Sequence, residues 1–102
     1  MACYRLTFHN NQVFDVVIDP APVHGSSQSN VRLALIYRVV AGHRDAEPLQ
    51  RTGGGPIQVL AVSQQTAVDI VKEVLREVTG SRLEAITECG PHPFAAPVPN
   101  TV

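Results

Sequence analysis

Polar and apolar residues alternate along the first part of this chain and follow a helical period later, between residues 64 and 79. Apolar residues in that segment recur every three or four positions, which predicts a helix with one apolar face. Short, partly β-branched runs at 57–62 and 83–89 flank it and predict two strands. The residues of the apolar helix face are Ala67, Ile70, Val71, Val74, Leu75 and Val78.

Both ends of the predicted helix carry capping signals. Ser63 precedes it, and a serine there can accept a hydrogen bond from a free backbone amide of the first turn. Gly80 follows it, and glycine readily adopts the left-handed conformation that closes a helix. Because valine and isoleucine are weak helix formers, we expect packing against a sheet to stabilise this helix.

Residues 4–18 show the two-residue alternation of a β-hairpin. A register that pairs Phe8 with Phe14, with a three-residue loop at 10–12, places every apolar residue of one parity on one face. In that register Arg5 lies diagonal to Asp15, close enough for a surface ion pair. The apolar residues that share the face are Tyr4, Leu6, Phe8, Phe14, Val16 and Ile18.

Residues 31–41 allow two interpretations. Their alternation and β-branched content favour a long strand. The alternative is a helix, since Ser29 or Asn30 could cap it and Gly42 could end it. Residues 19–30 and 43–56 are rich in proline, glycine and polar residues, which predicts two long loops.

Together these elements predict an α+β fold with the order β-β-β-β-α-β. One helix packs on one face of a mainly antiparallel sheet of about five strands. The chain has 102 residues, which is enough for a domain with a core of its own. We assign residues 1–90 to a single domain and residues 91–102 to a proline-rich C-terminal tail.

One helix leaves the other face of such a sheet open. Several residues assigned to that open face are apolar, and exposed apolar surfaces are often protein–protein contacts. We therefore expect a non-enzymatic interaction domain that forms a homodimer through this face, with another protein as a further candidate partner. If residues 31–41 were helical, they would instead cover the face within the chain. The candidate interface residues are Val13, Val17, Ile36 and Val40.

Composition narrows the classes of function. Eight basic and nine acidic residues give a net charge of −1, which argues against a nucleic-acid binder held by phosphate contacts. No segment reads as a signal peptide or is apolar over a membrane-spanning length, so we expect a cytoplasmic protein with no membrane association. In that setting Cys3 and Cys89 are expected to stay reduced; a bond between them requires that the first and last strands be neighbours.

Motifs that carry chemistry are weak in this sequence. Cys89 and His92 could supply two zinc ligands, but a structural zinc site needs four, so we expect no metal and no cofactor. Gly53, Gly54 and Gly55 lead into a strand, not into the Gly-Lys-Ser/Thr of a phosphate loop. The sequence has no Gly-x-Ser-x-Gly motif, and we lean towards a protein that is not an enzyme.

A second hypothesis is a small domain that binds an anionic ligand. Basic residues gather in and near the 42–56 loop, and the N-terminus of the helix at Ser63 can attract anions. The ligand would lie between that loop and the start of the helix. The candidate ligand-binding residues are Arg38, His43, Arg44, Arg51 and Ser63.

Overall fold

The computed structural model describes residues 2–20 and 31–89, and over these residues it contains a six-stranded sheet and a helix. All strand pairs are antiparallel. The predicted α+β fold is confirmed, and residues 31–41 provide a strand, not a helix. The predicted tail at 91–102 lies outside the described residues. The elements are β1 (Ala2–Phe8), β2 (Val13–Pro20), β3 (Arg32–Val40), β4 (His43–Arg44), β5 (Gln58–Ala61), α1 (Gln64–Thr79) and β6 (Leu83–Glu88).

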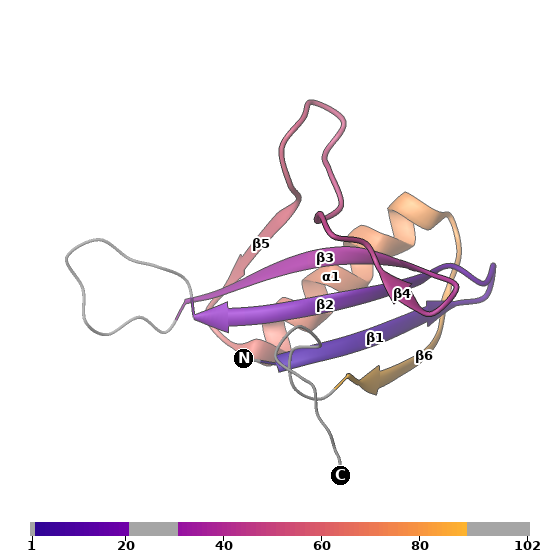
Figure 1. The fold of residues 1–102 in the computed structure, drawn as a ribbon. Helices are drawn as coiled ribbons and strands as arrows, with labels where there is room; N and C mark the ends of the chain where they lie inside the picture. Colours follow the sequence, from indigo (N-terminus) through magenta and orange to yellow (C-terminus); the bar gives the residue numbers. More distant parts are fainter. Residues whose placement is uncertain (1, 21–30, 90–102) are drawn as a thin grey trace, which may run out of the picture.

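The strands follow the order β4-β3-β2-β1-β6, with β5 also paired to β3 (Figure 1). One edge of β3 therefore carries two short strands in succession. β4 pairs with residues 39–40 at the end of β3, whereas β5 pairs with residues 32–35 at its beginning. The chain between β4 and β5 projects from the sheet as a long loop. The sequence did not predict β4, because a two-residue strand has no alternation to detect.

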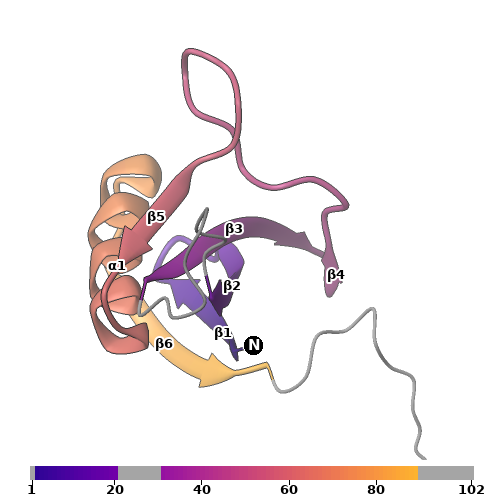
Figure 2. The same cartoon turned by 90° about the vertical axis from the view of Figure 1, so that its left-hand side faces the viewer.

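The capping signals of α1 are confirmed. Ser63 Oγ accepts a hydrogen bond from the Thr66 amide at 3.1 Å. Gly80 has φ of 66° and donates its amide to the Arg76 carbonyl at 3.0 Å. The helix covers one face of the sheet (Figure 2). Its buried residues are Ala67, Val68, Val71 and Leu75.

The core lies between α1 and the even-numbered residues of β1, β2 and β3. The rings of Phe8 and Phe14 meet edge to face with their centroids 6.0 Å apart. Full burial of such a side chain contributes about 1.5–3 kcal/mol, so this layer is the main source of stability. The buried residues that the strands contribute include Leu6, Phe8, Phe14, Val16, Ile18, Ala34 and Ile36.

The hairpin register differs from the predicted one by two residues. Leu6, not Phe8, pairs with Phe14. The loop occupies residues 9–11, where the Phe8 amide donates to the Gln12 carbonyl at 2.9 Å and Asn11 has φ of 71°. Asparagine tolerates this left-handed conformation, which a three-residue hairpin loop requires. Because the shift is even, every side chain keeps its predicted face.

The parity predicted for β3 is wrong. Ile36 pairs with Val16, is fully buried and packs in the core beneath the helix. It therefore does not belong to the open face, where Leu33, Leu35 and Tyr37 lie instead. Residues of both parities in β3 are largely apolar, so only the pairing with β2 decides which set faces the helix.

Candidate functional site

Asp15 is the residue around which the candidate site is built. It lies in the middle of β2 on the face away from α1, opposite Arg5 of β1 and Tyr37 of β3. Its side chain is 0% exposed. A buried carboxylate is strongly destabilising unless charged partners and hydrogen bonds satisfy it.

Two arginines satisfy this carboxylate. Arg5 donates from Nε to Oδ1 at 2.7 Å and from Nη2 to Oδ2 at 3.0 Å. Arg44 of β4 donates to Oδ2 from Nε at 3.0 Å and from Nη2 at 2.8 Å. The Arg44 side chain is only 4% exposed. Charge-assisted hydrogen bonds from guanidinium forks are among the strongest in proteins, so this triad fixes β1, β2 and β4 relative to one another.

The protonation of the triad follows from these contacts. Burial raises the pKa of Asp15, but the hydrogen bonds and charges of Arg5 and Arg44 outweigh it and bring the pKa below the ordinary value. The hydrogen bond to Asp15 raises the pKa of Arg5 above its ordinary value. Asp15 and Arg5 are therefore charged near neutral pH, and together with the Arg44 guanidinium they give the triad a net charge of +1.

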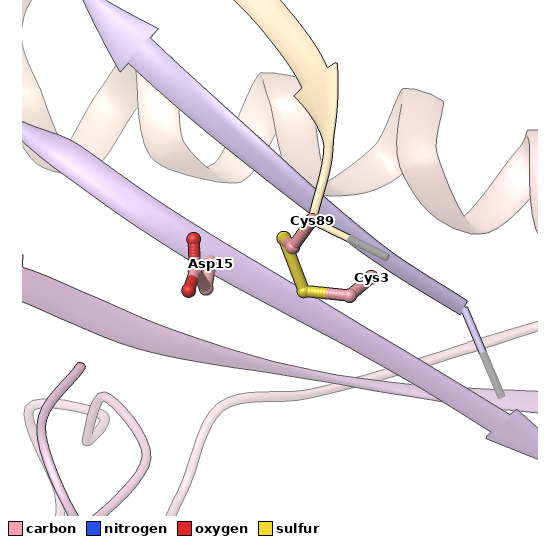
Figure 3. Close-up of side chains that lie close together, drawn as sticks. All are labelled: Cys3, Asp15 and Cys89. Atoms are coloured by element: carbon pink, nitrogen blue, oxygen red, sulfur yellow. A yellow bond between two sulfur atoms is a disulfide. The ribbon is translucent and has the colours of Figure 1, made fainter. Parts of the chain in front are cut away.

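A disulfide lies beside this triad. Cys3 of β1 and Cys89, just after β6, are joined, with their Cα atoms 5.0 Å apart. The Cys89 amide also donates to the Cys3 carbonyl at 2.9 Å. The sequence alone favoured reduced thiols, but β1 and β6 are neighbours, which is the condition that the bond requires. Figure 3 shows both cysteines close to Asp15.

Arg44 links the disulfide to the triad. Its Nη2 atom lies 3.1 Å from Cys3 Sγ as well as 2.8 Å from Asp15 Oδ2. The two sulfur atoms and a carboxylate oxygen of Asp15 all lie within 4.8 Å of one another. Both Asp15 oxygens already accept hydrogen bonds from guanidinium groups, and bonded sulfurs are not thiolate ligands. With the two cysteines joined, the cluster therefore offers no metal site, and the Arg44 guanidinium places positive charge next to Cys3 Sγ.

The ligand-binding residues predicted from the sequence do not form one site. Ser63 follows β5, which pairs with the beginning of β3, whereas Arg44 lies in β4 at the end of β3. At about 3.3 Å per residue, the two ends of the nine-residue β3 lie roughly 26 Å apart. The Ser63 hydroxyl caps α1, and Arg44 is held by Asp15.

The other three candidates lie on the surface. Arg38 stacks its guanidinium 5.9 Å from the centre of the Phe14 ring. It also lines a surface hollow of about 590 Å³ together with Asp45, Glu47 and other residues of the loop after β4. His43 is exposed in β4. Arg51 folds onto its own turn, where Nη2 donates to the Gly54 carbonyl at 3.3 Å.

Sequence reasoning missed the roles of Asp15 and Cys3. It placed Asp15 in a surface ion pair with Arg5; the partner is right, but the carboxylate is buried. A signal was present, because Val13 and Val17 flank Asp15 on the same face of the strand. A charge between two apolar neighbours on one face indicates a buried ion pair more than a solvated one. The contribution of Arg44 had no such signal, since it depends on how β4 folds back.

Comparison with known proteins places the chain in no family: no family model, curated protein or solved structure matches it. Function therefore has to be argued from the site and the surface. Within residues 2–20 and 31–89, no helix combines the length and apolar character needed to cross a membrane.

Proposed function

We propose that this chain is a non-enzymatic interaction domain that self-associates as a two-fold homodimer through the β5 edge of its sheet, where the open face is apolar. The observation that carries the proposal is an apolar corner, formed by Leu33, Leu35, Leu60 and Val62, at the junction of β3 and β5. Leu33 and Leu60 are direct cross-strand neighbours on the face away from α1. Leu60 is 59% exposed and Val62 is 72% exposed.

This corner replaces most of the interface expected from the sequence. Ile36 is in the core, and Val17 is nearly buried beside the triad. Val40 is exposed, but it has the same parity as Ile36, so it is not on the open face, and it lies at the other end of β3, next to β4. Val13 pairs with Val39 near that same end. The apolar surface that remains available on the open face is therefore concentrated around β5.

The edge of β5 supports a second copy as the occupant. One side of β5 pairs with β3, and its other side has no strand partner among the described residues. An exposed apolar edge strand is a template for pairing with another chain. Antiparallel pairing of β5 with its own copy satisfies two-fold symmetry, because each strand then presents the same residues to the other. Such pairing brings the two Leu60 side chains together.

Light scattering across a dilution series tests this proposal. We expect the wild-type mass to be that of a dimer and to fall towards that of a monomer on dilution. Leu60→Lys should give a monomer, since a lysine on an edge strand opposes pairing. Val78→Lys is the matched control, because Val78 is also apolar and 50% exposed, but it lies on α1. This variant should remain a dimer. A monomer mass for the wild type at the highest concentration would refute the proposal.

The cytoplasmic location expected from the sequence finds no support in the cysteine chemistry. Disulfides persist mainly in oxidising compartments, and the Cys3–Cys89 bond is closed in this structure. An oxidising compartment therefore fits the closed Cys3–Cys89 bond better than the cytoplasm does.

A further inference from the structure

The disulfide is chemically asymmetric, and this asymmetry is independent of the proposed dimer. Cys3 is buried, whereas Cys89 is partly exposed at the end of the edge strand β6. An attacking thiolate has to approach the sulfur that is broken on the line of the S–S bond, so access selects which sulfur is attacked. Access here favours attack on Cys89, with Cys3 as the leaving group.

Arg44 is placed to stabilise that leaving group. Its Nη2 atom donates to Cys3 Sγ at 3.1 Å, and its Nε and Nη2 atoms are held by Asp15 Oδ2. A neighbouring guanidinium favours the thiolate form of a cysteine, and a thiol that forms a thiolate readily leaves faster. Asp15 opposes this effect with its negative charge. Because Arg5 neutralises that charge from the other side, the triad presents a net positive charge to Cys3.

We propose that Cys3–Cys89 is a thiol–disulfide exchange site for low-molecular-weight thiols such as glutathione, with Cys89 the sulfur that is attacked and Arg44 stabilising the departing Cys3 thiolate. In the first step the thiolate sulfur of the small thiol bonds to Cys89 Sγ, the Cys3–Cys89 bond breaks, and its electron pair remains on Cys3 Sγ. The products are a mixed disulfide at Cys89 and a free Cys3 thiolate. A second small-thiol molecule then attacks the small-thiol sulfur of the mixed disulfide. This step releases the disulfide of two small thiols, and Cys89 leaves as a thiolate that takes up a proton.

The wild-type protein provides the first test. The full chain is incubated with millimolar reduced glutathione, quenched with acid and alkylated, and the modified cysteine is located by peptide mass spectrometry. We expect the glutathione adduct on Cys89 and the alkyl group on Cys3. An adduct mainly on Cys3 would overturn the proposal. So would a folded protein that forms no adduct while the urea-unfolded chain reacts, since the bond would then be structural only.

The second test concerns Arg44. Arg44→Met should slow formation of the adduct severalfold, because the departing Cys3 thiolate loses its guanidinium partner and a less stabilised thiolate leaves more slowly. Arg51→Met is the control, because Arg51 is exposed on a loop and contacts its own turn; its rate should equal that of the wild type. Arg44→Lys keeps a positive charge and should recover part of the rate. If Arg44→Met reacts at least as fast as the wild type while circular dichroism shows it folded, Arg44 does not have the role proposed here. If Arg44→Met fails to fold, the distribution of the adduct in the wild type still decides which sulfur is attacked.

Discussion

Arg5 and Asp15 lie directly opposite each other on β1 and β2, and Arg5 Nε is 2.7 Å from Asp15 Oδ1. Arg44 of β4 is the third member of this triad and donates to the other oxygen of Asp15. Asp15 is fully buried while Arg5 is partly exposed, so the carboxylate depends on protein groups more than on water. Buried ion pairs add little net stability when intact, but removing one partner strands the charge of the others.

Asp15→Asn should therefore destabilise the fold strongly. It leaves the Arg44 guanidinium, which is almost fully buried, without its carboxylate. We expect the free energy of unfolding in urea to fall by about 3 kcal/mol or more. Asp45→Asn is the control, because Asp45 is exposed, and it should change the free energy by less than about 0.5 kcal/mol. A small effect of Asp15→Asn would mean that the triad is well solvated in solution.

The same carboxylate should make stability depend on pH in the acid range. The pKa of Asp15 is lower in the folded state than its ordinary value of 3.8, so the folded state binds fewer protons than the unfolded state near that pH. The contribution of ionised Asp15 to the free energy of unfolding is fully present above the ordinary pKa. It is lost as the pH falls through the pKa that Asp15 has in the folded state. Carbon-detected NMR titration of the folded protein should place the Asp15 pKa below its ordinary value of 3.8. An Asp15 pKa at or above that value would contradict this account.

The elements of this fold were predictable because their signals are local. The apolar period and the caps at Ser63 and Gly80 define α1, and the alternation of residues 4–18 defines the hairpin and its buried face. Which residues face away from the helix, and which basic residues lie near one another, were harder to predict because both depend on how strands pair. Whether Ile36 faces the helix is decided by its neighbour Val16 on β2, and whether Ser63 meets Arg44 is decided by which end of β3 each short strand joins.

The triad and the disulfide show the same limit. Asp15 and Arg5 are close in sequence and were expected to pair. Cys3 and Cys89 are separated by 86 positions, and their proximity follows from the antiparallel addition of β6 beside β1. Nothing in the local pattern around Arg44 indicates that its side chain reaches both Asp15 and Cys3, because that contact depends on the fold-back of β4.

Gly80→Ala should destabilise the protein through the backbone. Gly80 closes α1 with φ of 66°, a conformation that costs other residues about 1 kcal/mol. We expect that decrease in the free energy of unfolding, although no atom lies within 4 Å of the added methyl group. Gly53→Ala is the matched control, because its site is equally open and its φ is not in the left-handed region. It should be neutral or slightly stabilising, since alanine restricts the unfolded chain.

The burial of Ile36 beneath α1 can be tested by comparing it with Val40, an exposed residue further along the same face of β3. Ile36 is fully buried beneath α1, whereas Val40 is 57% exposed. Ile36→Ala removes buried methyl groups and leaves a cavity, so we expect the free energy of unfolding to fall by about 2–5 kcal/mol. Val40→Ala should change it by less than about 0.5 kcal/mol. Urea denaturation at a protein concentration where the wild type is a monomer keeps association out of this comparison. If Ile36 instead faced a partner, as its place in the sequence suggested, Ile36→Ala would weaken association and leave the monomer nearly as stable as the wild type. A loss of monomer stability with Ile36→Ala, together with normal stability for Val40→Ala, would establish that Ile36 packs in the core beneath the helix and not against a partner.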